Sequence, residues 1–62
     1  MLEPLPTVQE LIAMSGLTQV EICRRTGISV KLMSEYKRGI YEPRFYNYQL
    51  IYNTVRQEIN KN

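Results

Sequence analysis

Isolated glycines divide this chain into short segments, and that division limits what it can fold into. The three glycines stand at positions 16, 27 and 39, and each closes a segment that opens on a serine or threonine. A serine or threonine hydroxyl caps a helix N-terminus, and glycine ends a helix because it adopts a left-handed backbone at no steric cost. The pattern predicts three short helices, over residues 8–15, 19–26 and 30–38.

The first two of these segments share a second signature. Thr7 and Thr18 are each followed three residues later by a glutamate, Glu10 and Glu21. In a capping box the threonine hydroxyl accepts from the third helical amide, and the glutamate reaches back to the cap. We therefore expect a capping box at both helix starts. The apolar side of the first helix is expected to consist of Leu11, Ile12 and Met14.

Proline and apolar spacing define the rest of the chain. Prolines at positions 4 and 6 keep residues 1–6 extended, because a residue before proline is pushed out of the helical region. Pro43 suits the start of a fourth helix, and apolar residues then recur at intervals of three and four, the spacing of one helix face. These residues are Phe45, Tyr48, Tyr52, Val55 and Ile59.

The fold class follows from these patterns. No segment alternates with a period of two, so no strand is expected. A length of 62 residues leaves room for one small domain. The predicted fold is all-α, a small bundle of four or five short helices forming a single domain over residues 1–62, with residues 60–62 as a frayed tail.

Composition excludes several classes of function. The chain has no histidine and one cysteine, so it can form neither a Cys/His zinc cluster nor an internal disulfide. It also lacks any Ser–His or Cys–His pair, its acids are scattered over separate segments, and its isolated glycines form no phosphate-binding loop. We expect no enzymatic activity, no metal and no cofactor.

Hydropathy indicates where the protein works. The longest strictly apolar run, residues 11–14, is far shorter than the ~20 residues that span a bilayer. An acid, Glu3, stands where a secretory signal would carry a lysine or arginine. We expect a cytoplasmic protein that binds no membrane and, at this size, no small-molecule ligand.

Positive charge is concentrated in the middle of the chain. The formal net charge is +2, from 8 basic and 6 acidic residues. Six of the basic residues and only two of the acids lie between Arg24 and Arg44, and the balance is reversed outside that window. A localised basic patch suits an anionic partner, but a solvated helix surface explains the same distribution. Charge alone leaves both interpretations open.

Residues 19–38 have the pattern of a helix-turn-helix. The two helices need a small side chain where they cross, which Cys23 supplies, and a turn residue without a Cβ clash, which Gly27 supplies. Ile28 closes the corner from the other side, while Met33 and Tyr36 bury the inner face of the second helix. The residues left facing outward, free to meet DNA, are Val30, Lys31, Ser34, Glu35 and Arg38.

The stretch from Leu17 to Val55 resembles the Cro/cI-type (XRE-like) helix-turn-helix repressor family of phages and bacteria. The resemblance implies a lambda-repressor-like fold and a bacterial cytoplasm. Thr26, Lys37 and Tyr52 depart from the usual pattern, and the bulk of Tyr52 leaves the dimer geometry open. The shared features are Leu17-Thr18-Gln19, Glu21-Ile22-Cys23, Gly27-Ile28-Ser29, Met33-Ser34, Gly39, Pro43 and the spaced apolar residues Phe45, Tyr48, Ile51 and Val55.

The same resemblance implies roles for individual residues. Lysine can donate to guanine, glutamate can accept from cytosine and aliphatic groups can meet a thymine methyl, so the start of residues 30–38 is expected to read base edges. Contacts to phosphate would position the protein without reading sequence. The expected base-reading residues are Val30, Lys31, Leu32 and Glu35. The expected backbone contacts are Gln19, Ser29, Ser34, Arg38, Tyr41 and Arg44.

Several of these residues have a purely structural alternative. Glu35 can pair with Lys31 or Arg38 on the same helix, which is worth only ~0.2–0.5 kcal/mol. Leu32 can belong to the core, and Cys23 is expected to be a small core residue rather than a redox sensor. The tyrosines of the last segment are expected to pack rather than to stack on bases. They are Tyr46, Tyr48 and Tyr52.

The function expected from all this is sequence-specific binding of double-stranded DNA by a transcriptional regulator, most simply a phage or mobile-element repressor. An activator, an excision directionality factor or an antirepressor-like protein-interaction module are the alternatives. Specific sites need ~10⁻⁸ M affinity, which one small module rarely reaches, so a homodimer on a palindromic operator is expected. Residues 44–59 would form the dimer, or alternatively complete the monomer core. The expected dimer residues are Tyr48, Tyr52, Val55 and Ile59.

Overall fold

The computed structural model describes residues 5–61, and over that range it contains four helices and no strand. The all-α bundle predicted from the sequence is confirmed. None of these helices combines the length and apolar character that crossing a bilayer requires. The expectations for residues 1–4 and 62 lie outside the described residues. The helices are α1 (Val8–Ser15), α2 (Gln19–Thr26), α3 (Val30–Arg38) and α4 (Phe45–Ile59).

Polar caps and glycines set the ends of the first three helices, as the sequence predicts. The capping box of α1 is complete: the Thr7 amide donates to Glu10 Oε1 at 2.9 Å, and the Glu10 amide donates to Thr7 Oγ1 at 3.1 Å. The hydroxyls of Thr18 and Ser29 cap α2 and α3 by accepting from the amides of Glu21 and Leu32, each at 3.1 Å. Glycines with φ of 71°, 80° and 80° end the three helices.

The fourth helix starts differently from the expectation. It begins at Phe45, two residues after Pro43, and its N-cap is Arg44, whose side chain makes no capping hydrogen bond. Arginine has no acceptor atom on its side chain, so it cannot replace a serine or threonine there. At the other end the Asn60 amide still donates to the Arg56 carbonyl at 2.9 Å, so residues 60–61 continue as a turn.

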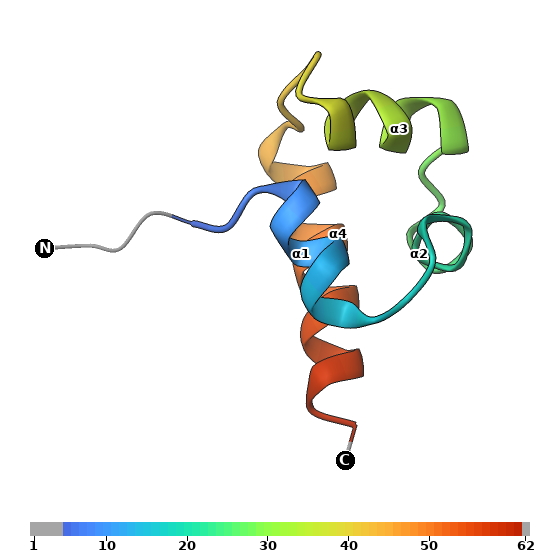
Figure 1. The fold of residues 1–62 in the computed structure, drawn as a ribbon, viewed down its shortest axis with the longest axis vertical. Coiled ribbons are helices and arrows are strands. Elements are labelled where there is room, and N and C mark those ends of the chain that lie inside the picture. The colour runs from blue at the N-terminus through green and yellow to red at the C-terminus, as the bar shows by residue number, and fades with distance from the viewer. Residues whose placement is uncertain (1–4, 62) are drawn as a thin grey trace, which may run out of the picture.

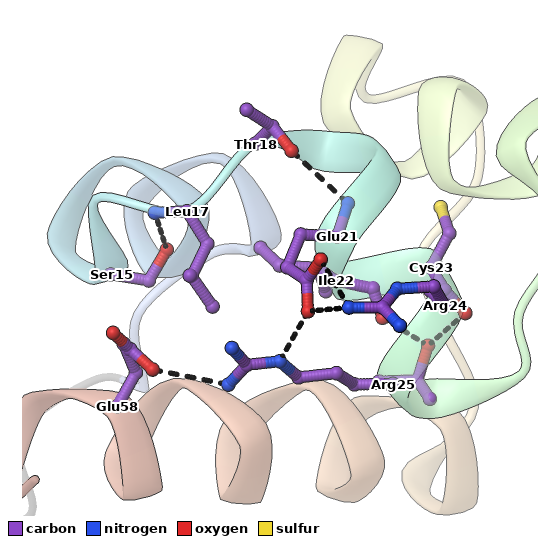
Figure 2. A network of polar contacts seen from close by, with 10 residues as sticks. Ser15, Leu17, Thr18, Glu21, Ile22, Cys23, Arg24, Arg25 and Glu58 are labelled. Carbon is purple, nitrogen blue, oxygen red and sulfur yellow. Dashed lines mark hydrogen bonds and ion pairs between the residues drawn. The ribbon is translucent and has the colours of Figure 1, made fainter.

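The expected capping box of α2 is only half formed, because the carboxylate of Glu21 binds two arginines instead (Figure 2). Arg24 and Arg25 each approach Glu21 Oε2 at 2.7 Å, and Arg25 also donates to Glu58 of α4 at 3.1 Å. Hydrogen bonds to charged donors are stronger than those to a neutral amide. Donation from Arg24 and then from Arg25 lowers the pKa of Glu21. The network joins α2 to α4 through side chains.

All four helices contribute to one core, with α1 lying against α4 and α3 crossing the end of the molecule at which α4 begins (Figure 1). Met14, expected on the inner side of α1, is 55% exposed, and Val8 takes that place instead. Val8 lies three and four residues before Leu11 and Ile12, which puts all three on one face. The remaining core residues are Ile22, Cys23, Ile28, Met33, Tyr36, Ile51 and Val55.

The apolar spacing of α4 does not correspond to a single environment. Val55 is completely buried beside Ile51, whereas Phe45 is 79% exposed and Ile59 is 43% exposed. The expected role of Val55 in a dimer is therefore wrong, because its side chain already fills the monomer core. Tyr48 and Tyr52 pack against that core as expected, and Tyr46, also expected to pack, lies in solvent.

Candidate nucleic-acid interface

The corner between α2 and α3 is closed by small and polar contacts. The Gly27 amide donates to the Cys23 carbonyl at 2.8 Å, and the Cys23 thiol lies 3.8 Å from the carbonyl of Ser29. Cys23 and Ile28 are both buried, which confirms their predicted places on either side of the corner. Burial raises the pKa of the Cys23 thiol, so it stays protonated at neutral pH and is a poor nucleophile and metal ligand.

Gln19 connects the start of α2 to the start of α3. Its Nε2 donates to the carbonyl of Val30, the first residue of α3, at 3.4 Å. This long, exposed hydrogen bond places the Gln19 amide beside the end of α3 that is expected to meet DNA. The second amide hydrogen of Gln19 remains available to an acceptor outside the protein.

The inner side of α3 is fixed against the rest of the bundle. Met33 is fully buried, Tyr36 is nearly so, and the Tyr36 hydroxyl accepts from Asn47 Nδ2 of α4 at 3.0 Å. Lys31 and Arg38 lie about 160° and 140° around the helix axis from Met33. Both are exposed, so the structure places these two cations on the side of α3 that faces away from the core.

Three other residues of α3 that are expected to contact DNA are less accessible than Lys31 and Arg38. Ser34 and Glu35 are half-buried, and Leu32 packs partly against the core. Glu35 forms no ion pair with Lys31 or Arg38 within residues 5–61, so the structural alternative for that carboxylate is wrong. Val30 is 51% exposed at the first position of the helix.

Ion pairing separates the basic residues into two groups. Arg24 and Arg25 are held by Glu21, and Arg25 also by Glu58, so much of their charge is neutralised within the fold. The cations of the basic window that form no ion pair within residues 5–61 are Lys31, Lys37, Arg38 and Arg44.

Lys37 is an exposed cation of α3 that is not among the expected contacts, although its spacing in the sequence points to it. It stands seven residues after Val30, so the two share a stripe along one flank of α3. Tyr41 and Arg44, predicted to hold the backbone, are both exposed between α3 and α4. These side chains extend the positive surface from α3 to the start of α4.

Two hollows lie away from the outward side of α3. One, of about 320 Å³, lies between residues 5–8 and 39–43, and the other, of about 270 Å³, lies between Leu5 and α4. Their linings contain one charged residue, Glu42. Nowhere in residues 5–61 do three Cys, Asp or Glu side chains gather closely enough to hold a metal ion.

Comparison of the chain with protein-family models, with curated proteins and with solved structures found no match. Its chemistry must therefore be inferred from the arrangement itself. A helix with outward cations can meet an extended anion, and nothing in its geometry encloses a small substrate.

Proposed function

We propose that the protein binds double-stranded DNA with α3 in the major groove, and that it acts as a transcriptional regulator of the Cro/cI type. The observation that carries this proposal is the outward face of α3, where Lys31 and Arg38 project from a helix anchored at a helix-turn-helix corner. The major groove of B-DNA, about 12 Å wide, admits one α-helix. A repressor is the simplest task for such a protein.

Base reading is proposed for the first turns of α3. Lys31 donates to guanine O6 and N7, and Val30 meets a thymine methyl. Glu35 accepts from cytosine N4. Its carboxylate is available for this contact because it forms no ion pair within residues 5–61. Leu32, which packs partly inward, contributes only the outer part of its side chain.

The phosphate contacts are proposed to surround this reading face. Gln19 approaches from the start of α2 beside Val30, which supports its role as a fixed donor. Arg38, Arg44 and the added Lys37 supply charge that no acid within residues 5–61 neutralises. Ser29 uses its hydroxyl as the cap of α3, accepting from the Leu32 amide, and can still donate its proton to a phosphate. Ser34 and Tyr41 complete the proposed set.

Selection of bound sequences from random duplexes tests the proposal most directly. We expect one preferred site, and an affinity that falls steeply with salt because phosphate contacts release counterions. Lys31→Ala should change the selected sequence. Lys61→Ala, which removes the same charge from an exposed residue beyond α4, should leave it unchanged. A protein-interaction module would select no sequence, and that result would overturn the proposal.

A further inference from the structure

Arg38 and Arg44, two of the cations proposed to bind phosphate, belong to different helices. Arg38 is the last residue of α3, and Arg44 is the N-cap of α4. Both side chains are exposed, and neither forms an ion pair within residues 5–61. Phosphate contacts from two elements fix the register of a protein on DNA only when the elements keep a constant spacing. Such a spacing needs a contact that holds the start of α4 beside the end of α3.

The connection between the two helices does not supply that contact. Residues 39–44 contain neither helix nor strand. The amides of Gly39 and Ile40 donate back to carbonyls of α3 at 3.1 and 3.0 Å, so they belong to the end of that helix. Residues 41–43 make no backbone hydrogen bond to any other part of residues 5–61. The side chain of Arg44 does not cap α4 either.

Packing does not supply it directly. Within residues 5–61, α3 packs mainly against α1 and α2, and the fully buried residues of α4 lie beyond its first turn. Phe45 and Tyr46, which open α4, are both exposed. The Tyr48 hydroxyl donates to the carbonyl of Pro6, which connects α4 to the segment before α1 rather than to α3. The start of α4 therefore needs another link to α3.

One side-chain hydrogen bond joins α3 to α4 directly within residues 5–61. Asn47 Nδ2, in the first turn of α4, donates to the Tyr36 hydroxyl at 3.0 Å. The Tyr36 side chain is buried, so the acceptor has a fixed place. Asn47 follows Arg44 by three residues, which is nearly one helical turn, and Tyr36 precedes Arg38 by two. The bond therefore connects the two short segments that carry the arginines.

We infer that Tyr36 and Asn47 are positioning residues of the proposed DNA interface, and that their hydrogen bond sets the place of Arg44 relative to Arg38. This inference rests on the proposed function, in which both arginines bind phosphates of one duplex. Tyr36 faces the core, so it acts through the arginines and not on DNA itself. A contact that fixes the backbone of Arg44 before DNA arrives reduces the freedom lost on binding, and this raises the affinity.

Titrations of the selected duplex at several salt concentrations test this role with two variants and a matched control. Tyr36→Phe keeps the buried ring and removes the hydroxyl, and Asn47→Ala removes the donor. Tyr52→Phe removes the hydroxyl of another tyrosine that packs against the core, one that makes no hydrogen bond within residues 5–61. Circular dichroism checks that all three variants fold.

We expect Tyr36→Phe and Asn47→Ala each to weaken binding about tenfold, the effect of losing a hydrogen bond to a charged group. Each should also reduce the slope of log affinity against log salt, by up to about 0.9. The double variant should bind no more weakly than either single variant, because both substitutions remove the same bond. Tyr52→Phe should bind like the wild type.

A further substitution separates positioning from a purely structural role. Because the bond acts through Arg44, Arg44→Ala should cost less affinity in the Tyr36→Phe background than in the wild type. Lys31→Ala, which removes a cation from the first turn of α3, should cost the same in both backgrounds. A general loss of stability would leave the costs of both substitutions unchanged.

The outcomes separate this inference from the proposed function. A wild type that selects no duplex overturns the two together. A wild type that selects a duplex, with Tyr36→Phe binding at full affinity and with an unchanged salt slope, overturns the positioning role alone. The same holds when Tyr52→Phe loses as much affinity as Tyr36→Phe, or when Arg44→Ala costs the same in both backgrounds.

Discussion

The α2–α3 pair and α4 divide core from solvent in different ways. In α2 and α3 the start of each helix is capped by a hydroxyl, the end is a glycine, and two residues of each helix are buried. α4 starts without a side-chain cap. It buries Ile51 and Val55, and it places its aromatic residues at half-buried and exposed positions. The difference shows that polar caps indicate where a helix begins and ends more clearly than the spacing of apolar residues indicates which of them are buried.

The largest expected effect lies within α4, where the same substitution, isoleucine to alanine, can be made at a buried site and at an exposed site. Ile51→Ala removes a fully buried side chain and should lower the free energy of unfolding by about 2–5 kcal/mol. Ile59→Ala, at a 43% exposed position of the same helix, should change it by less than about 0.5 kcal/mol. Urea unfolding measures both values. Equal losses would contradict the different burial of Ile51 and Ile59.

The α2–α3 side of the comparison is sharpened by its expected contacts with DNA. Lys31→Ala should cost about 1–3 kcal/mol on the selected site and relax the preference at one base pair. Arg38→Ala should instead weaken selected and unrelated duplexes alike, and reduce the slope of log affinity against log salt by about 0.9. Titrations of both duplexes at several salt concentrations separate the two effects. A base-selective loss from Arg38→Ala would contradict its assignment to the backbone.

A substitution at the turn between α2 and α3 is expected to change the free energy of unfolding by a smaller amount, and through backbone conformation alone. Gly27 has φ of 80°, and a Cβ built there would meet nothing within 4 Å. Gly27→Ala should therefore lower the free energy of unfolding by about 1–2 kcal/mol through the left-handed backbone alone. Gly27→Asn should cost less, since asparagine tolerates this conformation. Chemical unfolding of both variants checks the order, and a larger loss from asparagine would point to a steric cause.

The smallest expected effect concerns the link between the two regions. The lowered pKa of Glu21 means that its carboxylate stabilises the fold above the ordinary pKa of a glutamate, and that this contribution is lost as pH falls through the lowered value. Glu21→Gln should flatten the acid side of a plot of stability against pH. Glu42→Gln, at an exposed residue that forms no ion pair within residues 5–61, is the control and should keep the wild-type slope.

Much of the fold could be predicted from local sequence, because its signals act over three or four residues. Thr7, Thr18 and Ser29 each cap the helix predicted from them, and the glycines end those helices. The expectations that are wrong concern residues with more than one possible partner. Glu21 lies within reach of its own cap and of two arginines, and the spacing of residues does not show that it binds the arginines. Nor does the spacing show that Arg25 also binds the distant Glu58.

The candidate site was predicted less completely than the fold. The outward positions of Lys31 and Arg38 follow from helical periodicity once the buried side of α3 is known. Periodicity does not show that acids pair with Arg24 and Arg25. The pair between Arg25 and Glu58 depends on how α2 packs against α4. In α4 the residues Tyr48, Tyr52 and Val55 fit one stripe by spacing, and only the packing of α1 and α2 decides which of them is buried.

The buried thiol at the corner between α2 and α3 allows the local opening of that corner to be measured by chemical labelling. Cys23 is the single cysteine of the chain, so a thiol reagent labels one known place. Because Cys23 is buried, the reagent reaches its thiol chiefly when α2 and α3 separate. The labelling rate therefore measures how often this corner opens in the native state, without any engineered label. A duplex lying across both helices would hold the corner shut, and the thiol would then become slow to react.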